Sequence, residues 1–218
     1  VSNNAVELRN VTADRFSALG ASYVGYEMAD QADVVMNGNT LIAEGVTASD
    51  YAQFVAARSF FTDGDEEVYG QNILMQGNRL EMTDATLSGG SSVMSVSATD
   101  AGEARALNNT LEVSGLTARN DQGTAVTNVV AAHLDATVVE DSSFTGTTRL
   151  WGVRLVAENQ GIASGTSVSV SGATVSGYGL IEAVSVYSQD TVEVNNSTLL
   201  LSDVSMDGEP ALIAGVDS

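Results

Sequence analysis

The sequence contains no cysteine, no lysine and only one proline among its 218 residues. Without cysteine, the fold has neither a disulfide nor a thiolate metal site. The single proline, Pro210, is compatible with extensive β-structure, because proline removes a backbone donor from a sheet. Apolar runs are short as well, and none approaches the roughly 20 residues that a membrane-spanning helix needs.

Positive charge is scarce. The eight basic residues are all arginine and stand against 28 acidic residues, which gives a formal net charge of −20. Binding to nucleic acid needs a basic surface that displaces counterions from phosphates, so nucleic acid is not an expected partner. Docking on an anionic membrane surface is unexpected for the same reason. The acidic residues are spread along the sequence, which favours a solvated, mutually repelling surface.

The main positive feature of the sequence is a repeat. An eight-residue pattern, apolar–x–(Gly/Asn/Asp)–x–(Ser/Thr)–apolar–x–(small or polar), occurs seven times at intervals of roughly 31 residues. Its copies start at Leu8, Ala43, Met82, Val113, Val139, Val170 and Leu201. The third position always holds a residue that tolerates a left-handed backbone, and the fifth always holds serine or threonine. A fixed period of this length indicates stacked copies of one structural unit.

One copy, residues 165–190, illustrates the expected unit. Residues 166–171 alternate apolar and polar side chains, as a half-buried strand does. Two further strands are expected at 173–176 and 180–187, and the next coil is expected to begin at Thr191. In another copy, the alternation predicts that Leu111 and Val113 point inward and Glu112 outward. The sequence therefore predicts an all-β fold, a parallel β-helix (solenoid) with about seven coils of about 31 residues and three strands in each coil.

Helical periodicity is weak throughout. The best stretches, 13–19 and 51–61, lie in the two longest repeats. We expect both to belong to insertions, at about 13–35 and 50–72, within a single β-helix segment that spans residues 1–218. Because the repeats begin and end close to the ends of the sequence, we expect the segment to be excised from a longer protein.

The longest repeat contains an acidic stretch flanked by aromatic residues. Four carboxylates fall within five residues, at Asp63, Asp65, Glu66 and Glu67. Ca²⁺ prefers such oxygen ligands, but the spacing differs from that of the twelve-residue calcium loop, so a solvated acidic loop is the alternative. The aromatic residues nearby are Tyr51, Phe54, Phe60, Phe61 and Tyr69. Rigid scaffolds present loops for binding, so this segment is the expected recognition loop.

The hydroxyls at the fifth position of the repeat form a predicted column from Thr12 to Ser205. This column has two interpretations. It is an exposed ladder that binds a sugar or a neighbouring molecule, or a structural column that satisfies backbone groups at a corner or stacks threonine on threonine. The structural role is the expected one.

Two further groups of residues are candidate sites. His133 is the only histidine and precedes Asp135 by two residues, but no Gly-x-Ser-x-Gly nucleophile elbow accompanies it, so a catalytic triad is not expected. Trp151 lies between Arg149 and Arg154. This group either stacks against a sugar or packs within or upon the sheet.

The chain resembles the passenger regions of Gram-negative autotransporters, which are right-handed β-helices of the pertactin-like and AIDA types. The segments that carry the resemblance are 108–115 and 195–203, with the sequences NNTLEVSG and NNSTLLLSD. Richness in serine, threonine, glycine and asparagine, the lack of cysteine and the acidic charge match as well, over essentially the whole chain. The resemblance implies a right-handed β-helix that is secreted or displayed at the cell surface. It also implies anchoring in the outer membrane through a region outside this sequence, and a use in adhesion, biofilm formation or self-association.

Three function classes remain open. The first is a non-enzymatic adhesin whose partner is a host-surface glycan or protein, or another copy of the chain. The second is a polysaccharide-acting β-helix enzyme, a lyase or glycosidase, but lysine is missing and no arginine stands beside paired carboxylates. The third is a passive stalk that spaces a functional tip from the cell. No catalytic residue is expected, and Ca²⁺ at the acidic stretch is the only cofactor considered.

Overall fold

The computed structural model contains residues 1–218, most of which it describes. The backbone is described for residues 1–15, 17–26, 33–61, 72–89, 91–115, 117–118, 125–140, 143–146, 150–165, 167–171, 174–176, 179–188, 191–203, 205–207 and 211–217. Side chains are described for residues 1–15, 17–24, 33–59, 72–89, 91–98, 103–115, 155, 160–165, 167, 188 and 191–203.

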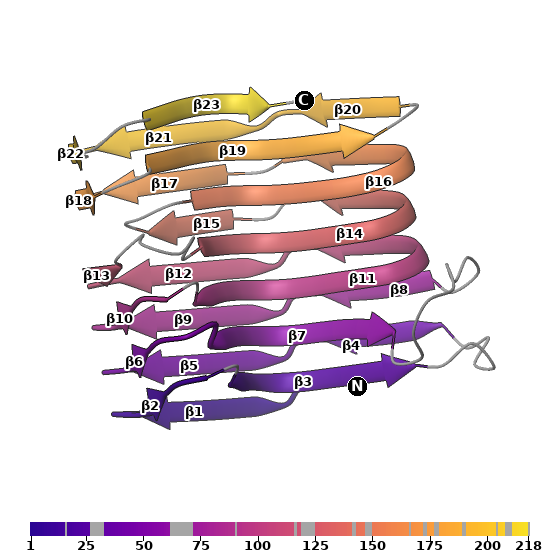
Figure 1. Ribbon diagram of the computed structural model, residues 1–218. Coiled ribbons are helices and arrows are strands. Elements are labelled where there is room, and N and C mark those ends of the chain that lie inside the picture. Colours follow the sequence, from indigo (N-terminus) through magenta and orange to yellow (C-terminus); the bar gives the residue numbers. More distant parts are fainter. Residues whose placement is uncertain are drawn as a thin grey trace.

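The described residues are all-β and contain no helix. Their strands pair in parallel, and each pairs with a strand of a neighbouring repeat, most of them with one on either side. Figure 1 shows the resulting stack, with the N-terminal strands at one end and the C-terminal strands at the other. The predicted all-β class with stacked parallel strands is confirmed, and the arrangement is compatible with a parallel β-helix. Within the described ranges, no helix is long and apolar enough to cross a membrane.

The first sheet takes one short strand from each repeat. Its order is β1 (Ala5–Arg9), β5 (Thr40–Glu44), β9 (Arg79–Thr83), β12 (Thr110–Ser114), β15 (Ser143–Gly146), β17 (Ser167–Ser171) and β21 (Thr198–Ser202). In β1, β5, β9 and β12, side chains alternate between the interior and solvent, as strand geometry requires. Leu111 and Val113 are buried while Glu112 is exposed, which confirms the predicted alternation.

The second set consists of very short strands that follow the first sheet along the chain. Four of them pair in the order β13 (Thr117–Ala118), β10 (Thr86–Leu87), β6 (Thr47–Ala48) and β2 (Thr12–Ala13). Nearer the C-terminus, β18 (Thr174–Ser176) pairs with β22 (Ser205–Asp207). The residue after each hydroxyl in β2, β6 and β10 is buried. These three strands therefore hold Thr12, Thr47 and Thr86 on the outside of the stack.

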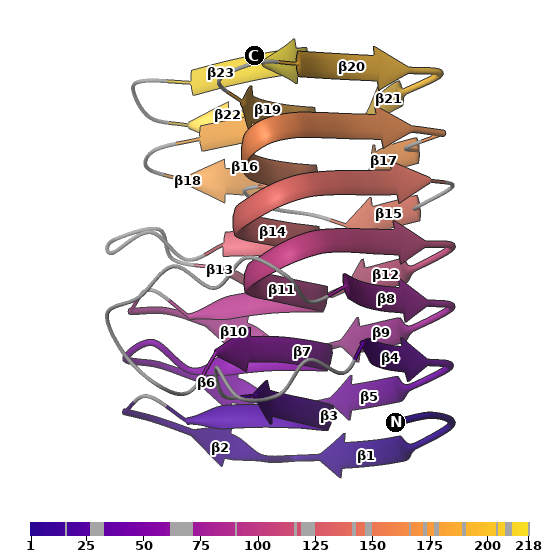
Figure 2. The same ribbon diagram turned by 90° about the vertical axis from the view of Figure 1, so that its right-hand side faces the viewer.

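The third sheet differs from the prediction, because several of its strands are twice the expected length. Its main path is β3 (Ala18–Tyr26), β7 (Gln53–Phe61), β11 (Ser92–Leu107), β14 (Ala125–Glu140), β16 (Leu150–Ser164), β19 (Gly179–Ser188) and β23 (Ala211–Asp217). Off this path lie β4 (Val34–Asn37), β8 (Asn72–Gln76) and β20 (Thr191–Asn195). Figure 2 shows how β11, β14 and β16 curve around one side of the stack.

Each long strand occupies the place that two shorter strands occupy in other repeats. The first half of β11 pairs with β7, and its second half pairs with β8. In the same way, β19 and β20 pair with the two halves of β16. A repeat therefore has three strands where the third is continuous, as in β9 to β11 and β12 to β14, and four where it is divided, as in β5 to β8. The prediction of three strands per coil holds for only some of the described repeats. Thr191 begins the fourth segment of its repeat and does not begin a new coil.

The sequence pattern misplaces the fifth copy of the repeat. It aligns Ser143 with Thr117, but Ser143 pairs with Thr110 and with Ser167 in the first sheet. The copy is shifted by seven residues, because Gly146, the partner of Val170, takes the position that the pattern assigns to Val139. Ser143 is therefore not a member of the hydroxyl column.

Parts of the predicted insertions are regular strands. Strand β3 pairs with β7 from Ala18 to Tyr26, and β7 pairs in turn with β11. The two stretches with the best helical periodicity, 13–19 and 51–61, are therefore not helices where they are described. Cross-strand pairing outweighs local periodicity here, because burial against neighbouring levels stabilises these residues as strands. Residues 27–32 and 62–71, within the predicted insertions, lie outside the described residues.

The corners of the stack share one backbone feature. Residues with a positive φ recur at three stacked corners, where the chain turns between strands. The first corner contains Asn3, Gly38, Gly77, Asn108, Gly165 and Asn196; the second contains Asn10, Gly45, Asp84, Gly115 and Asp203; the third contains Arg15, Asp50 and Gly89. The second corner is the third position of the sequence pattern. The third position, which always holds a residue that tolerates a left-handed backbone, has a positive φ at Asn10, Gly45, Asp84, Gly115 and Asp203.

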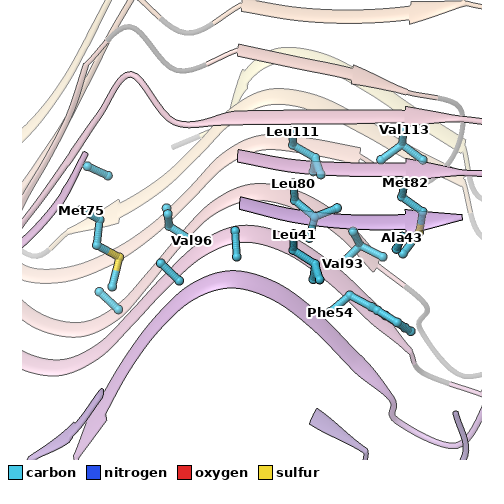
Figure 3. Packing of buried hydrophobic residues seen from close by; sticks show 14 of the residues in the cluster. Leu41, Ala43, Phe54, Met75, Leu80, Met82, Val93, Val96, Leu111 and Val113 are labelled. Carbon is cyan, nitrogen blue, oxygen red and sulfur yellow. The ribbon is translucent and has the colours of Figure 1, made fainter. Parts of the chain in front are cut away.

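The apolar core lies between the sheets and consists of columns of residues from successive repeats. Figure 3 shows one such column of Leu41, Leu80 and Leu111 and a second of Ala43, Met82 and Val113. All six side chains are at most 4% exposed. Full burial of a leucine stabilises a fold by about 1.5–3 kcal/mol, so each level depends on its neighbours to cover its apolar residues.

A ladder of asparagines runs inside the stack next to the first corner. Asn39, Asn78 and Asn109 are fully buried. The backbone N–H and the Nδ2 of Asn39 both donate to Oδ1 of Asn78 at 3.0 Å. The same two groups of Asn78 donate to Oδ1 of Asn109, also at 3.0 Å. Each level therefore donates to the next one toward the C-terminus, beginning with Asn4, which donates to Oδ1 of Asn39.

Candidate functional site

The hydroxyl column is the most regular polar feature on the outside of the stack. Thr12, Thr47, Thr86 and Thr117 pair level on level, and the first three are exposed. Stacked strands lie about 4.8 Å apart, so the column presents hydroxyls at a fixed short spacing. The predicted stacking of threonine on threonine is thus confirmed at these levels.

The backbone beside these hydroxyls does not depend on them. The Thr47 N–H donates to the Val11 carbonyl at 2.9 Å, and the Thr86 N–H donates to the Val46 carbonyl at 2.8 Å. Among the described residues, the hydroxyls of Thr12, Thr47 and Thr86 have no hydrogen-bond partner. The alternative in which the column satisfies backbone groups at a corner therefore does not hold for these three levels. Their hydroxyls are available to a molecule outside the stack.

Tyr51 lies in the turn that follows this column. It is 47% exposed and has a φ of 67°, directly after Asp50 with a φ of 52°. A left-handed backbone is unusual for a bulky residue and marks a locally strained position. The turn is held by the next level, because the Tyr51 N–H donates to the Gly89 carbonyl at 2.8 Å. A Cβ at Gly89 would lie 2.6 Å from the Asp50 nitrogen, so the two turns pack closely.

We call Thr12, Thr47, Thr86 and Tyr51 the hydroxyl–tyrosine surface. Flat aromatic rings and fixed hydroxyls are the groups with which proteins contact sugars, through stacking and hydrogen bonds. Neither group carries charge, so the surface suits a neutral polar ligand. Sequence reasoning identifies both parts but assigns the threonines a structural role. Their accessibility depends on which way the short strands face, which the pattern alone does not determine.

The structure excludes one residue from the predicted recognition loop. Phe54 is 0% exposed and belongs to the core, where it is one of the largest fully buried side chains, so it does not contact a ligand. Tyr51 remains exposed. Phe60 and Phe61 belong to strand β7, but their side chains lie outside the described residues, as does Tyr69 entirely.

The predicted calcium ligands Asp63, Asp65, Glu66 and Glu67 also lie outside the described residues. Within the part of the chain that the structure describes, no group of three or more His, Cys, Asp or Glu side chains is arranged to hold a metal ion. The calcium hypothesis therefore stays a prediction.

The outer face of the first sheet carries alternating charges. Arg79 forms ion pairs with Glu81 on its own strand at 2.6 Å and with Glu112 on the next level at 3.0 Å. The expectation that no arginine stands beside paired carboxylates is therefore wrong at this face. Arg9 is paired with Glu7 and lies 3.8 Å from Glu44. The hydrogen bond and charge of Glu7 raise the pKa of Arg9, and the charge of Glu44 contributes further. These pairs are exposed, so each contributes little to stability.

A shallow depression of about 230 Å³ lies beside this charged face. Its lining includes Glu81, Thr83, Glu112 and Ser114 on strands β9 and β12. The carboxylates of Glu81 and Glu112 are already paired with Arg79. The depression is therefore less suited to a ligand than the unpaired hydroxyls of the column.

The remaining candidates from the sequence are placed by the backbone alone. His133 lies in β14, and Trp151 pairs in register with Thr127 and Glu182 in the third sheet. Arg149 and the side chains of His133, Trp151 and Arg154 lie outside the described residues. Tyr23 in β3 pairs with Arg58 in β7. Burial raises the pKa of Tyr23, and the nearby charge of Arg58 lowers it by a smaller amount.

Comparison with known proteins leaves the chain without a family assignment. No family model matches the sequence, and no similar curated protein or solved structure is found.

Proposed function

We propose that this chain is a non-enzymatic adhesive module that binds a glycan at the surface of another cell through the hydroxyl–tyrosine surface. The proposal rests on one observation: exposed threonine hydroxyls without partners are stacked in register over successive levels. A repeating ligand matches a repeating surface, because each level offers one more equivalent contact and the contacts add through multivalency.

We further propose that the stack is a right-handed parallel β-helix of about seven coils, of the kind found in autotransporter passengers. Its parallel pairing and regular level-to-level register support this interpretation. The proposed location is the cell surface or the extracellular medium, with anchoring in the outer membrane through a region outside this sequence. The acidic charge and the absence of cysteine are consistent with that location.

The test is direct binding of the labelled 218-residue chain to an array of neutral and acidic glycans and to intact host cells. We expect binding to neutral glycans. In the variant Thr12→Val/Thr47→Val/Thr86→Val, the hydroxyls are removed at nearly constant volume, and the affinity should fall by at least about tenfold, or roughly 1.4 kcal/mol. Tyr51→Ala should weaken binding as well, because it removes the only aromatic ring of the surface.

Thr83→Val is the matched control. Thr83 is equally exposed but lies in β9 on the outer face of the first sheet. The Thr83→Val variant should bind glycans with the affinity of the unmodified chain. Equal affinity of the triple variant and the unmodified chain for the same glycan would contradict the proposal.

A passive stalk is the second candidate, because stacking of parallel strands extends the molecule level by level. A chain that binds neither glycans nor cells, yet is folded by circular dichroism, would favour the stalk over the adhesin. Enzymatic action on polysaccharides is the third candidate. Incubation with acidic glycans should release no unsaturated sugar that absorbs in the ultraviolet, and release of such a product would favour a lyase.

A further inference from the structure

The outer face of the third sheet carries an aromatic ring that lies against a glycine. Tyr23 in β3 is 37% exposed, whereas its neighbour Ser22 is 4% exposed. A Cβ at Gly20 would lie 2.5 Å from Cε2 of Tyr23, so the tyrosine ring occupies the space that a side chain at this position would need. The ring therefore lies along its own strand, and part of its surface is open to solvent.

An arginine stands beside this ring. Arg58 in β7 pairs in register with Tyr23, and its Nη1 donates to Oε1 of Gln53 at 2.6 Å. Gln53 and Arg58 flank Val55 on the same strand, and Val55 is 0% exposed although it is not part of the apolar core. Side chains on the outer face therefore cover Val55, and the hydrogen bond to Gln53 holds the guanidinium in a defined orientation.

The neighbours of Arg58 in the sheet are uncharged. Tyr23 and Ser97 pair with it on either side, and Gln53 and Val55 share its strand. Burial raises the pKa of Tyr23 and the charge of Arg58 lowers it by a smaller amount, so the ring is partly desolvated and within reach of that charge. A charge in such surroundings attracts an opposite charge more strongly than it does in water.

A similar pair of residues recurs in the same two columns of the third sheet. Through the register of β7, β11, β14 and β16, Arg154 occupies the column of Arg58, and Trp151 occupies the column of Val55. An arginine and an aromatic residue thus return three levels later. This recurrence favours a ligand that extends along the stack over an isolated small molecule.

We propose that Tyr23 and Arg58 bind a glycan whose sugars carry carboxylates. A sugar ring packs on the exposed part of the tyrosine ring, and its carboxylate accepts hydrogen bonds from the guanidinium. A carboxylate is favoured over a neutral group because a guanidinium matches it in charge and in the geometry of two parallel hydrogen bonds. This site shares no residue with the hydroxyl–tyrosine surface, so it goes beyond the binding of neutral glycans and does not depend on it.

The first test compares ligands and needs no substitution in the protein. The 218-residue chain is titrated in a calorimeter with trigalacturonic acid and with its methyl ester, which has the same sugar rings without charge. We expect the acid to bind at least about tenfold more tightly than the ester, because only the acid offers a charged partner to the guanidinium. Triglutamate carries carboxylates without sugar rings and should bind at least about tenfold more weakly than trigalacturonic acid.

The second test changes the site itself. Arg58→Met removes the guanidinium but keeps an unbranched side chain, and it should lower the affinity for trigalacturonic acid to that for the ester. Arg79→Met is the matched control, because it removes the same charge from the outer face of the first sheet. The Arg79→Met variant should bind the acid with the affinity of the unmodified chain. Tyr23→Ala should weaken binding of the acid and of the ester alike, because both pack on the ring.

The two proposed glycan sites are told apart by their ligands. Arg58→Met should leave the binding of neutral glycans unchanged, and the variant Thr12→Val/Thr47→Val/Thr86→Val should leave the binding of trigalacturonic acid unchanged. Failure of one proposal is therefore recognised without reference to the other.

Three results would overturn the acidic-glycan site. They are equal affinities for the acid and its methyl ester, equal affinities for trigalacturonic acid and triglutamate, and equal losses in Arg58→Met and Arg79→Met. Circular dichroism shows whether each variant remains folded. The two ligand comparisons decide the question even where a variant does not fold.

Discussion

Two polar columns follow the same stack with opposite environments. The asparagine ladder is buried, and its members donate both the backbone N–H and the side-chain amide to the next level. Thr12, Thr47 and Thr86 of the hydroxyl column are exposed, and their hydroxyls have no partner among the described residues. Both columns have the same period along the chain, so period alone does not reveal the role of a column. Burial does, because an inward polar group must be satisfied whereas an outward one is solvated.

The contrast between the columns predicts that the inner one contributes far more to stability. Asn78→Ala removes the acceptor of two donors of Asn39 and leaves the Met36 carbonyl without the Nδ2 donor that lies at 3.1 Å. Because these groups stay buried, the free energy of unfolding should fall by about 3 kcal/mol or more in urea titrations. Asn72→Ala is the control: Asn72 is exposed and donates only to Asp33, and its loss should cost less than about 1 kcal/mol. Equal losses of unfolding free energy in Asn78→Ala and Asn72→Ala would contradict the expected difference between buried and exposed polar groups.

The corners between the columns should show an intermediate effect. Gly45 has a φ of 63°, and a Cβ there would lie 2.6 Å from Oδ1 of Asn10, so Gly45→Ala should destabilise the fold by about 1–2 kcal/mol. Gly77→Asn is the sharper comparison. Gly77 has a φ of 61°, a Cβ there would meet no atom closer than 3.8 Å, and asparagine already occupies that corner at Asn3 and Asn108. The free energy of unfolding of the Gly77→Asn variant should differ from that of the unmodified chain by no more than about 0.5 kcal/mol. A larger loss than that of Gly45→Ala would show that local backbone strain does not determine which residues occupy these corners.

The smallest effect is expected in the outer column. Thr47→Val removes an exposed hydroxyl while keeping a β-branched side chain that favours a strand, so the unfolding free energy should stay within about 0.5 kcal/mol. Thermal and urea unfolding measure it. A loss comparable to that of Asn78→Ala would mean that the hydroxyl column holds the stack together, and its role in binding would then lose its main support.

The sequence predicts the stacking well because every level needs the same residues in the same places. The left-handed corner at Gly45, Asp84 and Gly115 and the inward pair Leu111 and Val113 follow from elementary backbone and burial rules, and both are confirmed. The bent strands are not predictable in this way, because a strand that curves around a corner has no turn residue to mark the division between its halves.

The shift of the fifth copy has a specific cause. Several repeats carry the same short pattern twice, seven residues apart, once at each of two corners. Asn108, Thr110 and Leu111 form one occurrence, and Gly115, Thr117 and Ala118 form the other. Ser143 belongs to the first kind although the pattern assigns it to the second, and only the pairing of Ser143 with Thr110 separates them.

The candidate site is only partly predictable for a related reason. The cluster of aromatic residues in the sequence identifies Tyr51, but Phe54, three residues later, points into the core. Tyr51 lies in the turn before strand β7, whereas Phe54 lies within the strand, and the sequence there predicts an insertion and not a strand. The sequence does not predict the asparagine ladder, because asparagines at turns are ordinarily solvated. Nothing in a single repeat indicates that these side-chain amides are buried.

The parallel pairing described above has a mechanical consequence. Hydrogen bonds between neighbouring levels run along the length of the stack, across the direction of the strands. Tension applied between Val1 and Ser218 would therefore load these bonds one after another, peeling away a single level at a time. In a force-extension measurement, the molecule should lengthen through a series of small, similar events, and a tether made of such levels would absorb a sudden load gradually.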